Sequence, residues 1–212
     1  MRTITFKGLF LTALLGCLSI QAADADLITK QITIKLEEAG TLPDKIGSSR
    51  KFQITNLKLV GEINGTDLRM IRNMAGSHSG NLSVLDLSEA KIVKGGDSYY
   101  SSDYYTSNDK IGDCAFFDCS RLTSLNLPSS ITTIGESAFR DCTELTSLTL
   151  SSNITWIGSY AFKGCSGLTS LTLPAGITRI GDYAFMYCSG LTSLNLPDGI
   201  TSIGYSAFEG CI

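Results

Sequence analysis

The stretch "IGSYAFKGCSGLTSLTLPAGITR", residues 157–179, decides the fold because its pattern recurs along the chain. Complete copies also begin at Ile111, Ile134 and Ile180, and a fifth copy begins at Ile203 and stops after ten residues. Twelve of the 23 columns are identical in all four complete copies, so the period is not accidental. A fixed period of about 20 to 50 residues is typical of repeat architectures, and this one predicts a solenoid.

The invariant columns predict how each repeat is built. In "LTSLNL", Leu122, Leu125 and Leu127 have the spacing of an extended segment that points its leucines into a shared interior, while the residues between them face out. Stacked side by side, these segments form a parallel sheet. The Ala-Phe pair of each copy and the Ile-Thr-x-Ile-Gly corner supply the opposite wall. One repeat cannot bury these side chains alone, but a stack of repeats can.

The N-terminal region carries the strand pattern in a looser form. The segments "ITNLKL" from Ile54 and "LSVLDL" from Leu82 both match the leucine segment of the repeat. Before them, "ITKQITIKL" from Ile28 alternates apolar and polar residues, which predicts a strand that caps the first repeat. Terminal repeats of a solenoid need such caps.

A helix is predicted in "NGTDLRMIRNMAG", residues 64–76. Thr66 or Asp67 is expected to cap its start, and Gly76 is expected to end it. The helical stripe of apolar side chains consists of Leu68, Ile71 and Met74.

The unit Ile-Gly-x-x-Ala-Phe-x-x-Cys-x-x-Leu-Thr-Ser-Leu-x-Leu-Pro-x-x-Ile-Thr-x resembles the repeat of the BspA-like leucine-rich-repeat proteins of bacterial surfaces. The resemblance is specific over residues 111–212 and looser over residues 27–109. It implies an α/β, β-rich, right-handed leucine-rich-repeat solenoid with a parallel sheet on one face and an N-terminal cap of strand and helix. It also implies adhesion to, or binding of, host or neighbouring-cell surface proteins or glycans, although the repeat itself specifies no ligand.

Three regions are expected along the chain. Residues 1–22 form a signal peptide, residues 26–110 form the N-terminal cap and irregular leucine-rich repeats with a tyrosine-rich insertion, and residues 111–212 form the regular repeats. The chain departs from the family pattern by ending within its fifth repeat. Because an uncapped last coil exposes apolar surface, we expect a fragment or a truncated product.

The first residues have the layout of an export signal. Arg2 and Lys7 provide a basic start, residues 9–20 are mostly apolar, and the small residues Ala22 and Ala23 follow. The apolar run is shorter than the roughly 20 residues that span a bilayer. Cleavage after Ala22 removes two positive charges and changes the formal net charge from −3 to about −5. This balance argues against nucleic acid or anionic lipid as a partner.

The signal also contains a candidate lipidation site. The sequence Leu14-Leu15-Gly16-Cys17 resembles the lipobox of bacterial lipoproteins, in which the cysteine becomes the lipidated first residue. Leu15 departs from the usual small residue, and the apolar run continues past Cys17. Export to the cell surface or the medium is predicted, and two alternatives stay open: a lipid anchor on Cys17, or an ordinary cysteine in a cleaved signal.

Five cysteines occupy one column of the repeat. Strands of a sheet lie about 4.8 Å apart with parallel Cβ vectors, whereas a disulfide needs Cβ atoms about 3.5 to 4.5 Å apart that incline toward each other. A zinc site needs four converging ligands, and a linear ladder supplies one thiol per layer. We therefore expect small apolar plugs that donate weakly to backbone carbonyls at the turn into each leucine strand. This structural thiol ladder consists of Cys119, Cys142, Cys165, Cys188 and Cys211.

No catalytic residue, metal or cofactor is predicted. The sequence has no Gly-x-Ser-x-Gly, His-Glu-x-x-His or phosphate-loop motif, and its single histidine, His78, lies in the loop-like stretch "AGSHSGN". A catalytic thiolate would therefore have no obvious base. Cys114 lies outside the ladder, and two interpretations stay open for it: pairing with another chain, or a lone thiol with no role.

The first candidate binding surface is the face of the predicted sheet. Its outward side chains are short, neutral and polar, so they can bind protein or glycan through many weak hydrogen bonds or simply keep the scaffold soluble. They are Ser124, Asn126, Ser147, Thr149, Ser170, Thr172, Ser193 and Asn195.

The second candidate surface is the corner before each Ile-Gly. Trp156, the only tryptophan, and Arg179 lie there in successive copies, where other copies have threonine or serine. Exposed tryptophan and arginine are favoured as binding anchors. The alternative is that the indole ring lies flat against its neighbours with Arg179 stacked over it.

The third candidate surface is the insertion "GGDSYYSSDYYTSNDK", residues 95–110. Tyrosines among small polar residues are typical of recognition loops, although such a loop can also pack over the first coil. The tyrosines are Tyr99, Tyr100, Tyr104 and Tyr105. The aspartates of this segment do not have the spacing of an EF-hand loop.

These features support one leading hypothesis and two others. The leading one is an exported, non-enzymatic binding and adhesion module, which is favoured by the solenoid, the signal and the lack of catalytic groups. The second is a structural spacer that presents a further domain of a larger surface protein. An enzyme is the third and is disfavoured because the chain has a single histidine.

Overall fold

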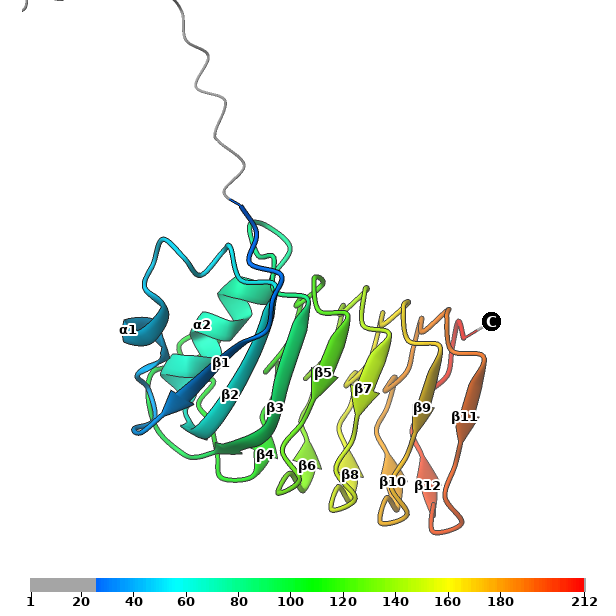
Figure 1. The fold of residues 1–212 in the computed structure, drawn as a ribbon. Coiled ribbons are helices and arrows are strands. Elements are labelled where there is room, and N and C mark those ends of the chain that lie inside the picture. Colours follow the sequence, from blue (N-terminus) through cyan, green and yellow to red (C-terminus); the bar gives the residue numbers. More distant parts are fainter. Residues whose placement is uncertain (1–25, 212) are drawn as a thin grey trace, which may run out of the picture.

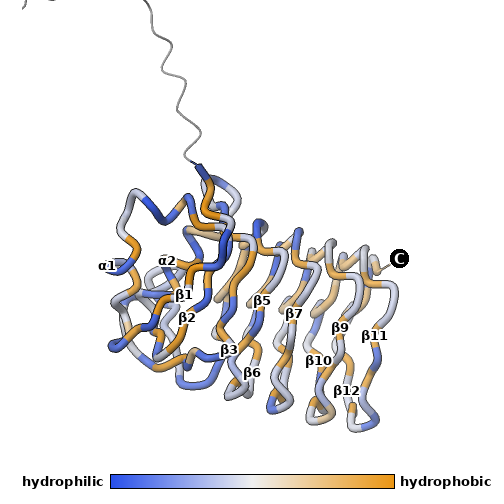
Figure 2. Tube along the Cα trace, viewed as in Figure 1, coloured by the Kyte–Doolittle hydropathy of each residue, from blue (hydrophilic) through white to orange (hydrophobic). Residues whose placement is uncertain are grey.

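The computed structural model describes residues 26–211, so the predicted signal and Cys17 lie outside the described residues. The described chain winds into a solenoid whose coils stack side by side, with an N-terminal cap at one end (Figure 1). Hydrophobic positions recur from coil to coil (Figure 2). The predicted leucine-rich-repeat solenoid is therefore confirmed.

The N-terminal region consists of three long strands and two helices. They are β1 (Ile32–Leu36), α1 (Leu42–Ile46), β2 (Asn56–Ile63), α2 (Gly65–Ala75) and β3 (Val84–Ile92). The strands predicted from Ile28, Ile54 and Leu82 are all present. The short helix α1 was not predicted, because a five-residue element is too short to show helical periodicity in the sequence.

Each regular repeat contributes one short strand to each side of the coil. The leucine segments form β5 (Ser124–Asn126), β7 (Ser147–Thr149), β9 (Ser170–Thr172) and β11 (Ser193–Asn195). The corners form β4 (Lys110–Ile111), β6 (Thr133–Ile134), β8 (Trp156–Ile157), β10 (Arg179–Ile180) and β12 (Ser202–Ile203).

All strand pairs of the two sides are parallel. On the leucine side the order is β1-β2-β3-β5-β7, followed by a separate pair β9-β11, and on the corner side the order is β4-β6-β8-β10-β12. Equivalent residues pair across coils, so Leu125 lies opposite Leu148 and Ile134 opposite Ile157. The 23-residue period therefore sets the register directly.

The leucine sheet is interrupted between β7 and β9, whereas the sequence predicts an unbroken sheet. The second repeat has Ser151 where the other three have proline. The Ser151 hydroxyl donates to the Ser129 carbonyl oxygen at 2.6 Å, and the Asn153 amide donates to the same oxygen at 2.9 Å. These bonds attach the second repeat to the first, while Leu148 and Leu150 next to the interruption are only partly buried. The corner strands β8 and β10 remain paired, so the coils separate on the leucine side alone.

A stack of aromatic rings forms the wall opposite the leucines. Successive phenylalanines lie face to face with centroids 5.1 to 5.4 Å apart, from Phe116 to Phe208. Some backbone bonds of this wall run between repeats, as when the Phe139 N–H donates to the Ala161 carbonyl at 2.8 Å, and others lie within a repeat, as when the Cys142 N–H donates to the Phe139 carbonyl at 3.2 Å. Backbone polar groups buried away from water need such partners. The predicted role of the Ala-Phe pair as a wall is confirmed.

Helix α2 begins two or three residues earlier than predicted. Asn64, not Thr66 or Asp67, is the N-cap, and its side chain accepts from the Thr66 N–H at 3.0 Å. Asp67 has the reciprocal role and accepts from the Asn64 N–H at 3.0 Å. Gly76 ends the helix as predicted, and the stripe of Leu68, Ile71 and Met74 is buried.

Asp67 also ties the N-terminal cap to this helix. Its carboxylate is fully buried and accepts from the Gly40 N–H at 2.6 Å and the Leu42 N–H at 2.9 Å, in addition to Asn64. A buried charge is tolerated only where hydrogen bonds satisfy it. The turn before α1, the first residue of α1 and the N-cap of α2 therefore share one carboxylate.

The cysteine column lies against the phenylalanine wall. Cys142, Cys165 and Cys188 are fully buried, and each thiol donates to the carbonyl of the phenylalanine one repeat earlier at 3.0 Å. Cys211 does the same to Phe185 and is partly exposed. Burial raises the pKa of the Cys119 thiol to about 12. The six described cysteines are free thiols.

Replacing Asp67 tests the cap. Asp67→Ala removes the shared acceptor and leaves buried N–H groups without a partner, so we expect a loss of about 2 to 4 kcal/mol in the free energy of unfolding. Urea denaturation measures it. As a control, Glu37→Ala removes one highly exposed ion pair with Lys35 and should change stability by about 0.5 kcal/mol or less. Equal losses for both variants would contradict the assignment.

Thiol labelling tests the ladder. In the native chain, Cys114 and Cys211 should react with a thiol reagent, while Cys119, Cys142 and Cys165 should react only on unfolding. Burial raises the pKa of Cys114, so its labelling should accelerate mainly above pH 9. A Cys114→Ser variant should lose this phase. Unfolded, unreduced protein with fewer than the full number of thiols would reveal disulfides and overturn the ladder.

Candidate binding surfaces

The tyrosine-rich insertion is a closed loop with a fixed base. The buried hydroxyl of Thr106 donates to the Val93 carbonyl at 2.8 Å and the Gly95 carbonyl at 3.0 Å, and Gly95 forms an antiparallel bridge with Thr106. The Tyr99 N–H donates to the Tyr104 carbonyl at 2.9 Å and closes the tip. The insertion therefore has a defined shape despite its small polar residues.

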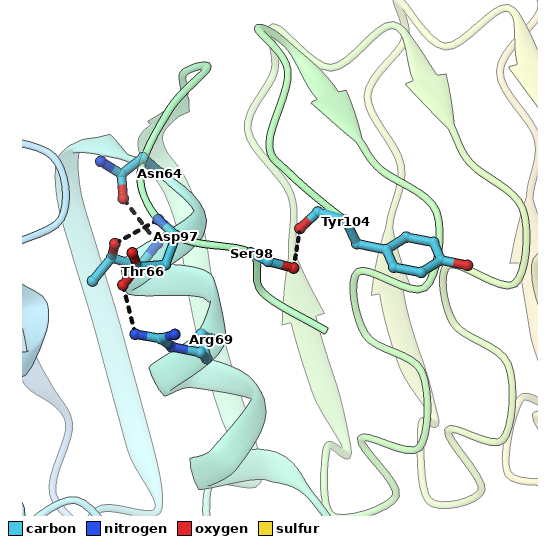
Figure 3. A network of polar contacts seen from close by, with 6 residues as sticks. All are labelled: Asn64, Thr66, Arg69, Asp97, Ser98 and Tyr104. Atoms are coloured by element: carbon cyan, nitrogen blue, oxygen red, sulfur yellow. Dashed lines mark hydrogen bonds and ion pairs between the residues drawn. The ribbon is translucent and has the colours of Figure 1, made fainter. Parts of the chain in front are cut away.

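The start of the insertion is attached to α2 (Figure 3). The Asp97 N–H donates to the Thr66 hydroxyl at 2.9 Å, and the Asp97 carboxylate pairs with Arg69 at 2.6 Å. Gly65 allows this close approach, because a Cβ there would lie 2.0 Å from the Asp97 carbonyl oxygen. Further along, the Ser98 hydroxyl donates to the Tyr104 carbonyl at 3.0 Å, and the Tyr104 ring points away from α2 toward the regular repeats (Figure 3).

Tyr99 does not form part of the exposed surface. Its side chain is 3% exposed, its hydroxyl donates to the Asp113 carbonyl at 2.8 Å, and burial raises the pKa of its phenol well above the ordinary value. The prediction of Tyr99 as a ligand contact is therefore wrong. The ring instead anchors the insertion to the first regular repeat, which the sequence alone does not distinguish from recognition.

The remaining tyrosines of the insertion are accessible to different degrees. Tyr100 packs between Arg72, at 4.7 Å from its ring centre, and Phe117, at 5.5 Å between centroids. Tyr104 is partly buried with its edge against Tyr100, and Tyr105 is 55% exposed. One side of the insertion thus packs on the first coil, as one interpretation expects. The other side faces solvent, where a recognition loop would have to contact its ligand.

Trp156 and Arg179 are neighbours on the corner sheet. They pair directly across β8 and β10, and the Trp156 side chain is 38% exposed. The cation–π contacts found among residues 26–211 do not include this pair. The alternative of Arg179 stacked over the indole is therefore not the arrangement in the structure.

Trp156 instead shares a cleft with the insertion. This cleft of about 380 Å³, which we call the Trp156 cleft, brings together the corner column and the tyrosine loop, two surfaces that are separate in the sequence. Its side chains come from the insertion, from β4 and from the corners of the next two coils. They include Asp103, Tyr104, Tyr105, Lys110, Asp113 and Trp156.

The polar sheet face is exposed along its C-terminal half. Ser124 and Asn126 of β5 are partly buried, whereas the other six predicted side chains, Ser147, Thr149, Ser170, Thr172, Ser193 and Asn195, are exposed. A second cleft of about 500 Å³ lies at the interruption between β7 and β9 and is lined by four of them. The face is therefore not the uniform ladder that the repeat pattern predicts.

A tyrosine cluster on the back wall was missed by sequence analysis. Tyr160 and Tyr183 stack at 4.9 Å, Tyr205 lies edge-on to Tyr183 at 5.4 Å, and Lys163 lies over the rings of Tyr160 and Tyr187 at 5.5 and 5.7 Å. Three of these tyrosines have positive φ angles of 57° to 60°, a conformation that favours glycine, asparagine and aspartate. The sequence does show tyrosine in columns that are otherwise filled by serine, cysteine, aspartate, glutamate or glycine.

His78 lies in a third cleft of about 690 Å³ beside α2. The Ser77 hydroxyl contacts the His78 ring nitrogen Nδ1 at 3.2 Å and also donates to the Asp118 carboxylate at 3.3 Å. In a hydrolase triad the histidine lies between serine and acid, so this order is wrong for nucleophile activation. Among the described residues, no cluster of three or more histidine, cysteine, aspartate or glutamate side chains is placed to hold a metal ion.

The comparisons with known proteins identify the family. The family model described as "BspA type Leucine rich repeat region (6 copies)" matches residues 98–212, which is more than half of the chain. The chain therefore belongs to the BspA-type leucine-rich-repeat family. No curated protein sequence gives a significant match.

Three solved structures are similar to this chain. A leucine-rich-repeat protein from Bacteroides ovatus aligns over 85% of this chain and 35% of its own, with 21% identity and a TM-score of 0.51. A leucine-rich cell surface protein from Faecalibacterium prausnitzii aligns over 85% and 45%, with 25% identity and a TM-score of 0.50. The T. pallidum leucine-rich-repeat protein aligns over 50% and 49%, with 32% identity and a TM-score of 0.48. This chain thus spans less than half of the length of each.

Replacing Tyr99 tests the anchoring of the insertion. Tyr99→Phe removes the donor to the Asp113 carbonyl, and we expect a loss of about 1 kcal/mol in the free energy of unfolding and faster chymotrypsin cleavage in residues 95–109. Tyr205→Phe, on a tyrosine that is 71% exposed, is the matched control. Unchanged cleavage in Tyr99→Phe would show that the hydroxyl does not hold the loop.

Proposed function

We propose that this protein is a non-enzymatic binding and adhesion module of the bacterial cell surface, which recognises protein or glycan ligands through its repeat surface. The observation that carries the proposal is the Trp156 cleft. The invariant apolar columns of the repeat are mostly buried in packing, whereas the exposed rings of Trp156 and Tyr105 lie in one cleft, in segments where the repeat does not require an aromatic residue. Exposed tryptophan and tyrosine are typical binding anchors.

The chemistry of the described residues supports binding rather than catalysis. Ser77, His78 and Asp118 are exposed or partly exposed and have the wrong order for acyl transfer. Four of the five ladder thiols are buried and Cys211 is partly exposed. Burial raises the pKa of Cys142 and Cys165, which disfavours the nucleophilic thiolate.

Location at the cell surface is supported by two observations. The first residues have the layout of an export signal, with Cys17 as a possible lipid anchor. The F. prausnitzii neighbour is described as a cell surface protein. The partners proposed are surface proteins or glycans of a host or a neighbouring cell. Within residues 26–211, no helix combines the length and apolarity needed to cross a membrane.

A spacer role is the second candidate function. It is favoured by the length of the neighbouring proteins, which are at least twice as long as the portion aligned here. In that case the repeats would hold another domain away from the cell, and the exposed side chains would have no ligand of their own.

A binding screen separates the two functions. The exported chain is tested against matrix proteins and an array of glycans, and binding to at least one is expected. Trp156→Thr, which copies the residue of the preceding repeat, should lower the affinity about tenfold or more, because a central aromatic anchor is lost. Ser202→Thr, in the same column two coils away, is the control. Absence of any binder, or binding indifferent to Trp156, would favour the spacer.

A further inference from the structure

We propose that the Trp156 cleft binds a neutral pyranose ring of a glycan. The inference rests on the proposed binding function and names the ligand class of that site. Its volume of about 380 Å³ lies within the range of about 300 to 1,000 Å³ that is usual for small-ligand sites.

The aromatic residues of the cleft suit the apolar face of a sugar. Trp156 comes from the corner sheet and Tyr105 from the insertion, and both rings are accessible. A pyranose ring presents C–H groups on one face, which pack against the π face of an indole or a phenol. The partly buried Tyr104 supports the insertion side, because its ring packs against Tyr100. Two aromatic side chains from separate elements therefore offer contact surface for one ring.

The polar residues of the cleft suit the rim of the same ring. Asp113 is oriented by the bond between its Oδ1 atom and the Glu136 N–H at 2.8 Å. Its Oδ2 atom accepts no hydrogen bond from residues 26–211, so it can accept from a sugar hydroxyl. Asp103 offers a second carboxylate, and Lys110, which forms no ion pair with the described residues, offers a donor. Carboxylate acceptors and an ammonium donor around an aromatic contact match the alternating hydroxyls of a hexose.

The charge of the cleft selects among glycans. Two carboxylates against one ammonium leave the cleft with net negative charge, which disfavours sialic and uronic acids. An aromatic site with net negative charge can also attract a quaternary ammonium ion, although the Lys110 ammonium in the same cleft opposes it. Such an ion has no N–H groups for the carboxylates, whereas a neutral hexose offers hydroxyls to the carboxylates and to Lys110.

The cleft is held in shape before any ligand arrives. Tyr99 fixes the insertion to Asp113, Thr106 closes its base, and Trp156 extends from the paired strand β8. Preorganised side chains lose less conformational freedom on binding, so a small ligand gains affinity. The Trp156 cleft is thus a built site rather than a chance gap between coils.

The single tryptophan makes the proposal directly measurable. Trp156 is the only tryptophan in the 212 residues, so the fluorescence of the full exported chain reports on this cleft alone. It is titrated separately with methyl glucoside, methyl galactoside, methyl mannoside, N-acetylglucosamine, sialic acid and choline. We expect a saturable change with at least one neutral sugar and a weaker response, by about tenfold or more, to sialic acid and choline.

Variants test the roles of the side chains in the same assay. Tyr105→Ser and Asp103→Asn each retain the fluorophore and should weaken the binding of the neutral sugar about tenfold. Tyr205→Ser removes a tyrosine outside the cleft that is even more exposed, at 71% against 55% for Tyr105, and should leave binding unchanged. Circular dichroism of each variant checks that the solenoid is intact.

Several outcomes would overturn the assignment. Tighter binding of sialic acid or choline, no saturable response to any neutral sugar, or indifference to both cleft variants would each do so. If the protein panel described above still shows binding that depends on Trp156, the glycan assignment fails while the binding function stands. If neither assay shows a ligand, both proposals fail.

Discussion

The structure depends on in-register stacking of 23-residue coils, because each coil completes the hydrogen bonds and the core of its neighbour. The Phe139 N–H donates to the Ala161 carbonyl, and the Cys165 thiol donates to the Phe139 carbonyl, so part of the hydrogen bonding of the wall is completed only by the neighbouring repeat. The phenylalanine rings stack at about the strand spacing for the same reason. A residue inserted within a strand or within the phenylalanine wall of one repeat would move the residues beyond it out of their columns, whereas the loop between β3 and β4 accommodates an insertion without loss of register.

This constraint separates packing residues from the rest. The residue types in columns that face the interior are restricted by packing, whereas the corner before each Ile-Gly and the insertion before β4 tolerate different residue types. It is there that the chain places Trp156 and Tyr105, and the coil geometry brings them into one cleft although they are 51 positions apart in the sequence. The scaffold therefore determines where a ligand can bind, and the variable side chains determine which ligand it is.

The sequence predicted the regular part well because local pattern and long-range packing coincide in a repeat. Leu125 pairs with Leu148 simply because both occupy one column. The prediction failed where several side chains are able to play the same role. Asn64 and Asp67 are both suitable as the N-cap of α2, and only the positions of Gly40 and Leu42 reveal that Asp67 also binds the N-terminal cap of the solenoid. Likewise, the sequence does not distinguish the roles of Tyr99 and Tyr105. Tyr99 is buried and its hydroxyl donates to the Asp113 carbonyl, whereas Tyr105 is exposed.

By itself, the sequence determined the repeat, the parallel solenoid, the strand register and the absence of recognised catalytic motifs, because identical columns must stack on one another. Only the tertiary structure decided that the leucine sheet is interrupted after β7, that Tyr99 anchors the insertion, and that Trp156 and the insertion share a cleft. These features depend on contacts between residues that occur once in the chain, such as Ser151 with Ser129. A periodic pattern cannot predict such contacts, because it carries information only about what the repeats have in common.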